Sequence, residues 1–383
     1  MRSVLRRPVL LLSVAATIAV PGALTLLAVL GHAHADSAAG TRPASLGTEL
    51  AQGSQQGAGL PAGSGSDIRA PSAAARARGL VLLSRAAAAG RAASYQGVES
   101  IADTTLAGPS TVVATVWHRG GGLTVTQLAG GQPEATYDSD GRTLEGVFGV
   151  TTALVRLLDK NYVPVYLGPG SLAGRSALVV GVRRADGSTA ARFWLDERTL
   201  LPLRRDVYDP SAHLVSDDRF TSVRFGPARM PRVAAGPGQS AWTAASPAHL
   251  LSILNGEGCL LPRTLPGDLS LYAAAQAPTP AGPVTDLGFS DGLSRVSLFV
   301  ERGTLPAKMP GWQPERISGH VVYVAQHEVA MSGRGFVYTL VTDAPPQTVD
   351  AVVTALPANG KPGFLNRLGR GLGRIADALD PFR

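Results

Sequence analysis

Side chains that could perform chemistry are scattered along this sequence of 383 residues. His327-Glu328 lacks the second histidine, four residues along a helix, that a zinc protease needs. No serine, histidine and acid can be assigned to a triad, and no glycine pattern for a nucleotide follows a strand and opens a helix. The other single histidines are His118, His213, His249 and His320. The sequence predicts no catalytic residue, no metal ligand and no cofactor, and it favours a binding protein over an enzyme.

Two further candidates have a structural interpretation. The single cysteine, Cys259, cannot form an intramolecular disulfide. Its neighbours supply no cation or histidine to lower its pKa, so we expect a buried, inert thiol. The run Asp138-Ser139-Asp140-Gly141 begins like a calcium loop but lacks the later ligands, which favours a hairpin turn.

The net charge of +7 sits at the ends of the chain. Residues 1–35 carry three arginines and no acid, and residues 361–383 carry five basic and two acidic side chains. The stretch between them holds 27 basic and 26 acidic residues. Because no basic stripe remains for a phosphate backbone, the sequence predicts no nucleic-acid partner.

The first 35 residues have the three parts of an export signal. Arg2, Arg6 and Arg7 precede an uncharged run from Val9 to Leu30, and Ala33-His34-Ala35 offers a cleavage site. The run is also long enough to span a hydrocarbon core of about 30 Å, so both a cleaved signal and a retained anchor stay open. Either way the rest of the chain lies outside the membrane, because cationic flanks stay inside.

Composition predicts a tether after the signal and two folded domains beyond it. Residues 36–71 hold Gly, Ser, Ala, Gln and Pro with few large apolar side chains, which is typical of a flexible linker. A second break, rich in Pro and Gly, covers residues 227–240. These breaks leave a first domain at 72–226 and a second at 241–357, followed by a tail at 358–383.

The first domain has the pattern of an antiparallel sheet with covering helices. Helical spacing predicts a helix from Pro71-Ser72 to Ala93 and another at residues 151–160. Alternation and turn residues such as Asp186-Gly187 predict the strands. These strands cover residues 95–102, 111–118, 123–128, 135–137, 177–184, 189–196, 203–208 and 213–225. A sheet of this length curls, so we expect an α+β fold in which a curved half-barrel encloses an apolar cavity.

Alternation also suggests which side chains would line this cavity for a ligand. The candidates are Val112, Val116, Val125, Phe193 and Leu195. The pattern leaves open which face of each strand points inward.

Several runs of the first domain give the sequence a family resemblance. They are Leu82-Leu83-Ser84-Arg85, Ser94-Tyr95-Gln96-Gly97, Leu172-Ala173-Gly174-Arg175, Phe193-Trp194-Leu195-Asp196-Glu197 and Leu201-Pro202-Leu203-Arg204. In order and spacing they resemble the MucB/RseB family of sigma-E regulatory proteins. The resemblance implies a first domain similar to the lipoprotein carriers LolA and LolB.

The second domain is predicted to be a smaller α+β unit. Helices are expected at residues 247–254 and 345–356, and Asp291-Gly292 predicts a hairpin. The strands are expected at 269–274, 283–290, 294–302, 321–325, 327–331 and 335–342. The run from Phe289 to Glu301 is similar to the second-domain hairpin of the same family, so the resemblance spans about Ser72 to Pro357.

The tail has the pattern of a basic amphipathic helix. Its apolar residues Phe364, Leu368, Leu372, Ile375 and Leu379 fall on one helical face, and Arg367, Arg370 and Arg374 lie elsewhere on the helix. Such a helix can lie on an anionic membrane or dock on a partner. Packing back on its own domain is the alternative.

The family resemblance implies a role in the cell envelope. Members bind the exposed segment of a membrane anti-sigma factor, protect it from proteolysis and release it when a lipid or misfolded component occupies the carrier-like cavity. We therefore expect an exported regulator of a sigma-factor stress response, with an anti-sigma factor as partner and a lipid or lipoprotein as ligand. A lipid or lipoprotein carrier without a regulatory role, and a secreted hydrolase, are the alternatives.

Overall fold

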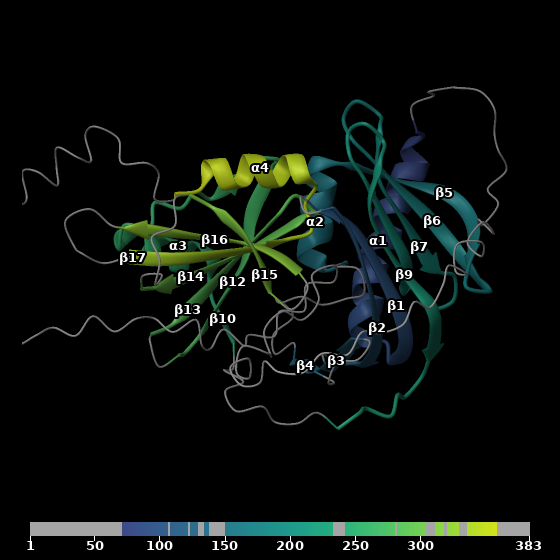
Figure 1. Ribbon diagram of the computed structural model, residues 1–383. Coiled ribbons are helices and arrows are strands. Elements are labelled where there is room, and N and C mark those ends of the chain that lie inside the picture. Colours follow the sequence, from purple (N-terminus) through teal and green to yellow (C-terminus); the bar gives the residue numbers. More distant parts are fainter. Residues whose placement is uncertain are drawn as a thin grey trace, which may run out of the picture.

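Figure 1 shows the chain as a computed structural model. Its described part holds two β-sheets and four helices. The structure describes residues 71–105, 108–121, 123–128, 134–137, 150–232, 242–279, 282–303, 311–317, 320–328 and 335–357. The export segment, the linker up to residue 70, the run Asp138 to Gly141 and the tail residues 358–383 lie outside this part. Most of the predicted break at 227–240 also lies outside it.

The first domain is built on a nine-stranded antiparallel sheet with the order β4-β3-β2-β1-β9-β8-β7-β6-β5. Strands β1 to β4 form one meander and β5 to β9 another, and the pairing of β1 with β9 joins the two, which leaves β4 and β5 as the edges. The strands are β1 (Tyr95–Thr105), β2 (Gly108–Arg119), β3 (Leu123–Leu128), β4 (Glu134–Tyr137), β5 (Val163–Leu172), β6 (Arg175–Arg183), β7 (Thr189–Asp196), β8 (Pro202–Tyr208) and β9 (Leu214–Phe225).

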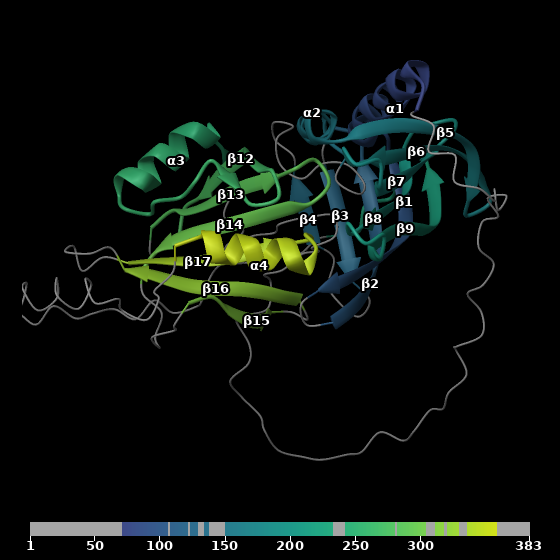
Figure 2. The same ribbon diagram turned by 90° about the horizontal axis from the view of Figure 1, so that it is seen from above.

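Two helices lie against one side of this curved sheet, near its β5 end (Figures 1 and 2). They are α1 (Ala73–Ala92) and α2 (Thr152–Asn161). The predicted start of α1 is confirmed, because Ser72 Oγ accepts a hydrogen bond from the backbone N–H of Ala75. Gly79 permits close packing on β5, since a Cβ there would lie 2.8 Å from the backbone nitrogen of Val165.

The second domain is built on an antiparallel sheet with the order β10-β12-β13-β14-β17-β16-β15, and β11 pairs with β12. Helices α3 (Pro247–Gly256) and α4 (Pro346–Ala355) contribute Leu250, Leu254 and Val352 to its core. The strands are β10 (Thr243–Ala244), β11 (Thr264–Leu265), β12 (Leu269–Ala277), β13 (Val284–Ser290), β14 (Arg295–Arg302), β15 (Gln313–Ile317), β16 (His320–Glu328) and β17 (Gly335–Thr342).

Cys259 lies in this second core with no exposed surface, as predicted. Burial raises the pKa of its thiol to about 12. The thiol is therefore protonated at neutral pH and is a poor nucleophile.

The structure confirms the α+β class with a curved antiparallel sheet and corrects three details of the predicted elements. Strand β5 was not predicted, because Pro164, Gly168 and Pro169 are typical of a loop. It is tolerated as an edge strand, where a missing N–H costs no ladder bond. The short strands β10 and β11 and strand β15 were also missed. The break predicted between strands at 321–325 and 327–331 is wrong, since one strand, β16, continues from His320 to Glu328, and residues 329–331 lie outside the described part.

Candidate functional site

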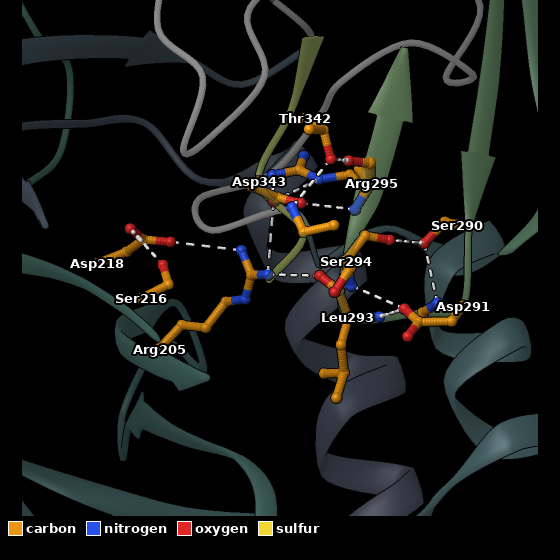
Figure 3. Close-up of polar contacts among 12 residues, drawn as sticks. Arg205, Ser216, Asp218, Ser290, Asp291, Leu293, Ser294, Arg295, Thr342 and Asp343 are labelled. Carbon is orange, nitrogen blue, oxygen red and sulfur yellow. Dashed lines mark hydrogen bonds and ion pairs between the residues drawn. The ribbon is translucent and has the colours of Figure 1, made fainter. Parts of the chain in front are cut away.

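The candidate site lies where the two domains meet, at the loop of the β13–β14 hairpin (Figure 3). We name Asp291, Gly292, Leu293 and Ser294 the hairpin loop. The carboxylate of Asp291 fixes its shape, because Oδ1 accepts hydrogen bonds from the backbone N–H groups of Leu293 (2.8 Å) and Ser294 (2.7 Å). The loop is thus organised by its own sequence and presents Leu293 as a rigid unit.

The end of α2 holds the hairpin loop from the first domain. The Tyr162 hydroxyl donates to Asp291 Oδ2 at 2.6 Å, and the Asn161 side chain donates to the Asp291 carbonyl at 2.9 Å. Gly292 lies against Leu158 with a φ of +102°, and a Cβ at Gly292 would be 2.2 Å from the Leu158 nitrogen. Only glycine fits this contact, both because of its φ and because of the space.

Leu293 fills an apolar hollow in the first domain. Only 5% of its surface is exposed, and it packs in the same cluster as Leu83, Leu158 and Phe193. The hollow lies under α1 and α2, and its first-domain lining consists of Leu83, Val150, Leu154, Val155, Leu158, Phe193 and Arg205. The space that remains for the centre of a water molecule is about 10 Å³. Because one water needs about that much, the hollow is essentially full.

Buried charges adjoin the hollow and cross the domain boundary. Arg205 on β8 donates to the Leu293 carbonyl and to Asp218 Oδ2, the latter at 3.3 Å. Its other ion-pair partner is Asp343 of the second domain, at 3.6 Å. Asp343 in turn accepts from Arg295, with 3.0 Å between Nη2 and Oδ2. All four charged side chains are at most 3% exposed, so each charge depends on its partners for stabilisation.

Two carboxyl groups of this region have raised pKa values. Burial raises the pKa of Asp218 to about 6, although the neighbouring Arg205 opposes the shift. Burial and the charge of Asp218 raise the pKa of Glu99 to about 8. Glu99 belongs to the same face of the sheet, because its neighbour Ile101, two residues along β1, pairs with Asp218. The face that carries the hollow therefore also carries acids that resist ionisation.

The pairing register decides which predicted cavity residues share a face. Directly paired residues lie on one face of a sheet, and Phe193 pairs with Arg205, which pairs with Asp218. Asp218 pairs with Ile101, and Ile101 pairs with Val112. Val112 and Phe193 therefore face the same side.

The five predicted cavity residues occupy three places. Phe193 lines the hollow, and Leu195 lies in the same core cluster. Val112 and Val116 pack in a neighbouring cluster around Ile101 and Phe220. Val125 pairs with Trp117 and so lies on the opposite face from Val116. Their role in ligand binding stays a prediction.

Sequence reasoning missed Arg205, Leu293 and Asp343. In the sequence, Arg205 is one polar residue in an alternating strand, and Leu293 belongs to an ordinary hairpin turn. One signal was available. The hairpin Phe289 to Glu301 was among the runs that resemble the MucB/RseB family, and its loop is the contact between the domains.

A Gly-x-Ser-x-Gly pattern also stands in this hairpin, at Gly288 to Gly292, and sequence reasoning passed over it. A nucleophile elbow needs an exposed serine between a strand and a helix. Here Ser290 ends a strand of a β-hairpin and has no exposed surface. Its hydroxyl donates to the Ser294 carbonyl at 2.7 Å and accepts from the Gly292 N–H at 2.9 Å. Ser290 thus stabilises the hairpin loop.

No group of three or more His, Cys, Asp or Glu side chains within the described part of the chain could hold a metal ion. Among the helices of this part, none is both long and apolar enough to cross a membrane.

The fold and the site define a two-domain protein in which a hairpin of one antiparallel sheet fills a hollow on the curved sheet of the other. Residues 124–241 match the family model of the MucB/RseB N-terminal domain. This match confirms, over these residues, the resemblance to the MucB/RseB family that the sequence shows. No curated protein matches the sequence.

The chain is also similar to several solved structures. MucB of the Pseudomonas aeruginosa MucA/MucB complex is 21% identical, with 74% of this chain and 100% of that chain covered and a TM-score of 0.46. A structure of MucB is 22% identical, and the match covers 74% of this chain and 98% of that chain at a TM-score of 0.48. A LolA superfamily protein from Nitrosomonas europaea is 11% identical, and the match covers 39% of this chain and 94% of that chain at a TM-score of 0.19.

Proposed function

We propose that this chain is an extracytoplasmic regulator that binds the exposed segment of a membrane anti-sigma factor. The observation that carries the proposal is the match of residues 124–241 to the MucB/RseB N-terminal domain, together with the family-like runs in both domains. By the family resemblance, the bound protein shields the anti-sigma segment from proteolysis. Binding would thus modulate the release of a sigma factor.

The N-terminal segment supports a location of the two domains on the outer side of a membrane. Arg2, Arg6 and Arg7 before the apolar run would keep the start of the chain inside and the two domains outside. We assign residues 36–71 to a tether, 72–226 to the MucB/RseB N-terminal domain and 241–357 to the second domain. The basic tail at 358–383 is proposed to contact the membrane or the partner.

The proposed regulator also senses an apolar ligand. The hollow under α1 and α2 has apolar walls, and its one charged lining residue, Arg205, is a cation. A lipid or an acylated envelope component has an apolar chain that matches these walls and a polar group that matches Arg205. A ligand can drive release of the partner only if it prefers the unbound form, and a hollow between two domains supplies such a preference.

The proposal predicts direct binding to an anti-sigma protein. The extracytoplasmic segment of the anti-sigma factor is immobilised, and the exported form of this chain is passed over it at micromolar concentration. We expect retention on this segment and no retention on the cytoplasmic segment of the same anti-sigma factor. Failure to retain the chain at this concentration contradicts the regulatory role.

A carrier of lipid or lipoprotein without a regulatory role is the second candidate, and the apolar hollow is the observation in its favour. Mass spectrometry of the exported form, read together with the binding assay on the anti-sigma segment, distinguishes the two. A carrier is expected to co-purify with lipid and to leave the immobilised anti-sigma segment unbound.

A further inference from the structure

The hollow of the first domain is occupied by a residue of the second domain. The Leu293 side chain lies among Leu83, Leu158 and Phe193. The Leu293 carbonyl accepts a hydrogen bond from the Arg205 guanidinium, which lines the same hollow. One residue thus places a branched aliphatic group in the apolar part and an oxygen acceptor on the cation (Figure 3).

This combination matches the chemistry of an amphiphile. A carboxylate joined to an alkyl chain also offers oxygen acceptors next to an apolar group, and its charge makes a stronger hydrogen bond to a guanidinium than a neutral carbonyl does. We propose that Leu293 is an internal stand-in for an anionic amphiphile, whose alkyl chain enters the hollow and whose headgroup takes the place of the Leu293 carbonyl on Arg205. The inference rests on the proposed ligand sensing and deepens it.

The guest and the hairpin loop exclude one another. The space left beside Leu293 holds about one water, so an alkyl chain enters only when Leu293 leaves. Its departure breaks the Tyr162–Asp291 and Asn161–Asp291 hydrogen bonds, which hold the loop on α2. Ligand binding is therefore coupled to separation of the two domains at this contact.

The charges around Arg205 favour an anionic headgroup. Two carboxylates face its guanidinium, Asp218 from the first domain and Asp343 from the second. Asp343 is bound to Arg295 of its own domain through the backbone N–H and the side chain, so it leaves with the hairpin loop. Arg205 then keeps Asp218 alone and has free donors for a carboxylate or phosphate oxygen.

The test measures how tightly the exported form binds dodecanoic acid, by isothermal titration calorimetry. Leu293→Ala removes the internal occupant and is expected to tighten binding about tenfold or more. Tyr162→Phe leaves the lining of the hollow unchanged and removes one bond of the hairpin loop, so it is expected to tighten binding about threefold. Leu260→Ala is the matched control for Leu293→Ala, because Leu260 lies in the same domain as Leu293 and is 71% exposed. This control should bind the acid as the parent does.

Two further measurements complete the test. Small-angle scattering should show a larger radius of gyration for the parent protein with dodecanoic acid than without it, because the domains separate. The methyl ester of the same acid should bind at least about tenfold more weakly, since it offers Arg205 no charge.

Three outcomes overturn the inference: no binding of the acid to any variant, equal affinity of Tyr162→Phe and the parent, or equal affinity for acid and ester. If Leu293→Ala folds poorly, the affinity of Tyr162→Phe still tests the inference. Binding of the anti-sigma segment is measured without lipid. A failure of that test is therefore distinct from a failure of the test with dodecanoic acid.

Discussion

The Tyr162 hydroxyl donates a 2.6 Å hydrogen bond to Asp291 Oδ2 across the boundary between the two domains. Asp291 at the same time shapes the hairpin loop through the N–H groups of Leu293 and Ser294. Burial raises the pKa of Asp291, and these hydrogen bonds oppose the rise. One carboxylate therefore both forms the loop and binds it to the other domain.

Gly292→Ala is expected to destabilise the protein by about 2–4 kcal/mol, because the new Cβ meets the Leu158 backbone and the φ is unfavourable for alanine. Chemical denaturation measures the loss. Gly187→Ala is the matched control, since Gly187 has a φ of +86° and nothing lies within 4 Å of its Cβ position. The control should lose only about 1 kcal/mol. An equal loss in both variants would show that contact with Leu158 contributes nothing.

Asp343→Ala should cost about 3–5 kcal/mol of the free energy of unfolding. The substitution leaves the buried guanidinium of Arg295 without its carboxylate and weakens the pairing of Arg205. Urea denaturation of variant and parent tests the prediction. Glu257→Ala breaks the more exposed pair with Arg302 and is expected to cost less than about 1 kcal/mol. Similar costs for the two variants would contradict the network proposed at the domain boundary.

Stability should fall as the pH rises from about 5 to 8. The folded-state pKa of Glu99 is about 8 and that of Asp218 about 6, both above their ordinary values. The folded state therefore binds more protons than the unfolded state in this window, and the stabilising contribution of the protonated acids is lost as they ionise. Urea denaturation at several pH values measures the slope.

Glu99→Gln tests the cause of this slope. The amide cannot ionise, so the loss of stability above pH 6 should become smaller than in the parent. Asp186→Asn is the control, because Asp186 is exposed and its pKa is lowered by hydrogen bonds from Ser188. This control should keep the parent slope between pH 5 and 8. An unchanged slope in Glu99→Gln would assign the pH dependence to other groups.

Deletion of the residues after Lys361 should weaken binding to anionic liposomes or to the anti-sigma partner. The expected cause is loss of the apolar face of Phe364, Leu368 and Leu372 together with four arginines. Co-sedimentation with vesicles that contain phosphatidylglycerol measures the first effect. Neutral vesicles are the control. Unchanged binding to both targets favours a tail that packs on its own domain.

The sequence alone determined most of the local structure. It placed β7 at its observed bounds, because Asp186-Gly187 makes a turn and the following residues alternate. It also placed the start of α1 at Ser72 and contained the order of motifs that resembles the MucB/RseB family. These features depend on neighbours a few residues apart, so local rules suffice.

Only the tertiary structure decided the site. The pairing of β1 with β9 puts Glu99 beside Asp218, and the approach of the second domain puts Leu293 on Arg205. No spacing in the sequence records these contacts, because they join residues about 90 or more positions apart. An Asp-Gly turn has the same local pattern in solvent and in the core of another domain. Contact with α2 and with Arg205 of the first domain is what buries this one.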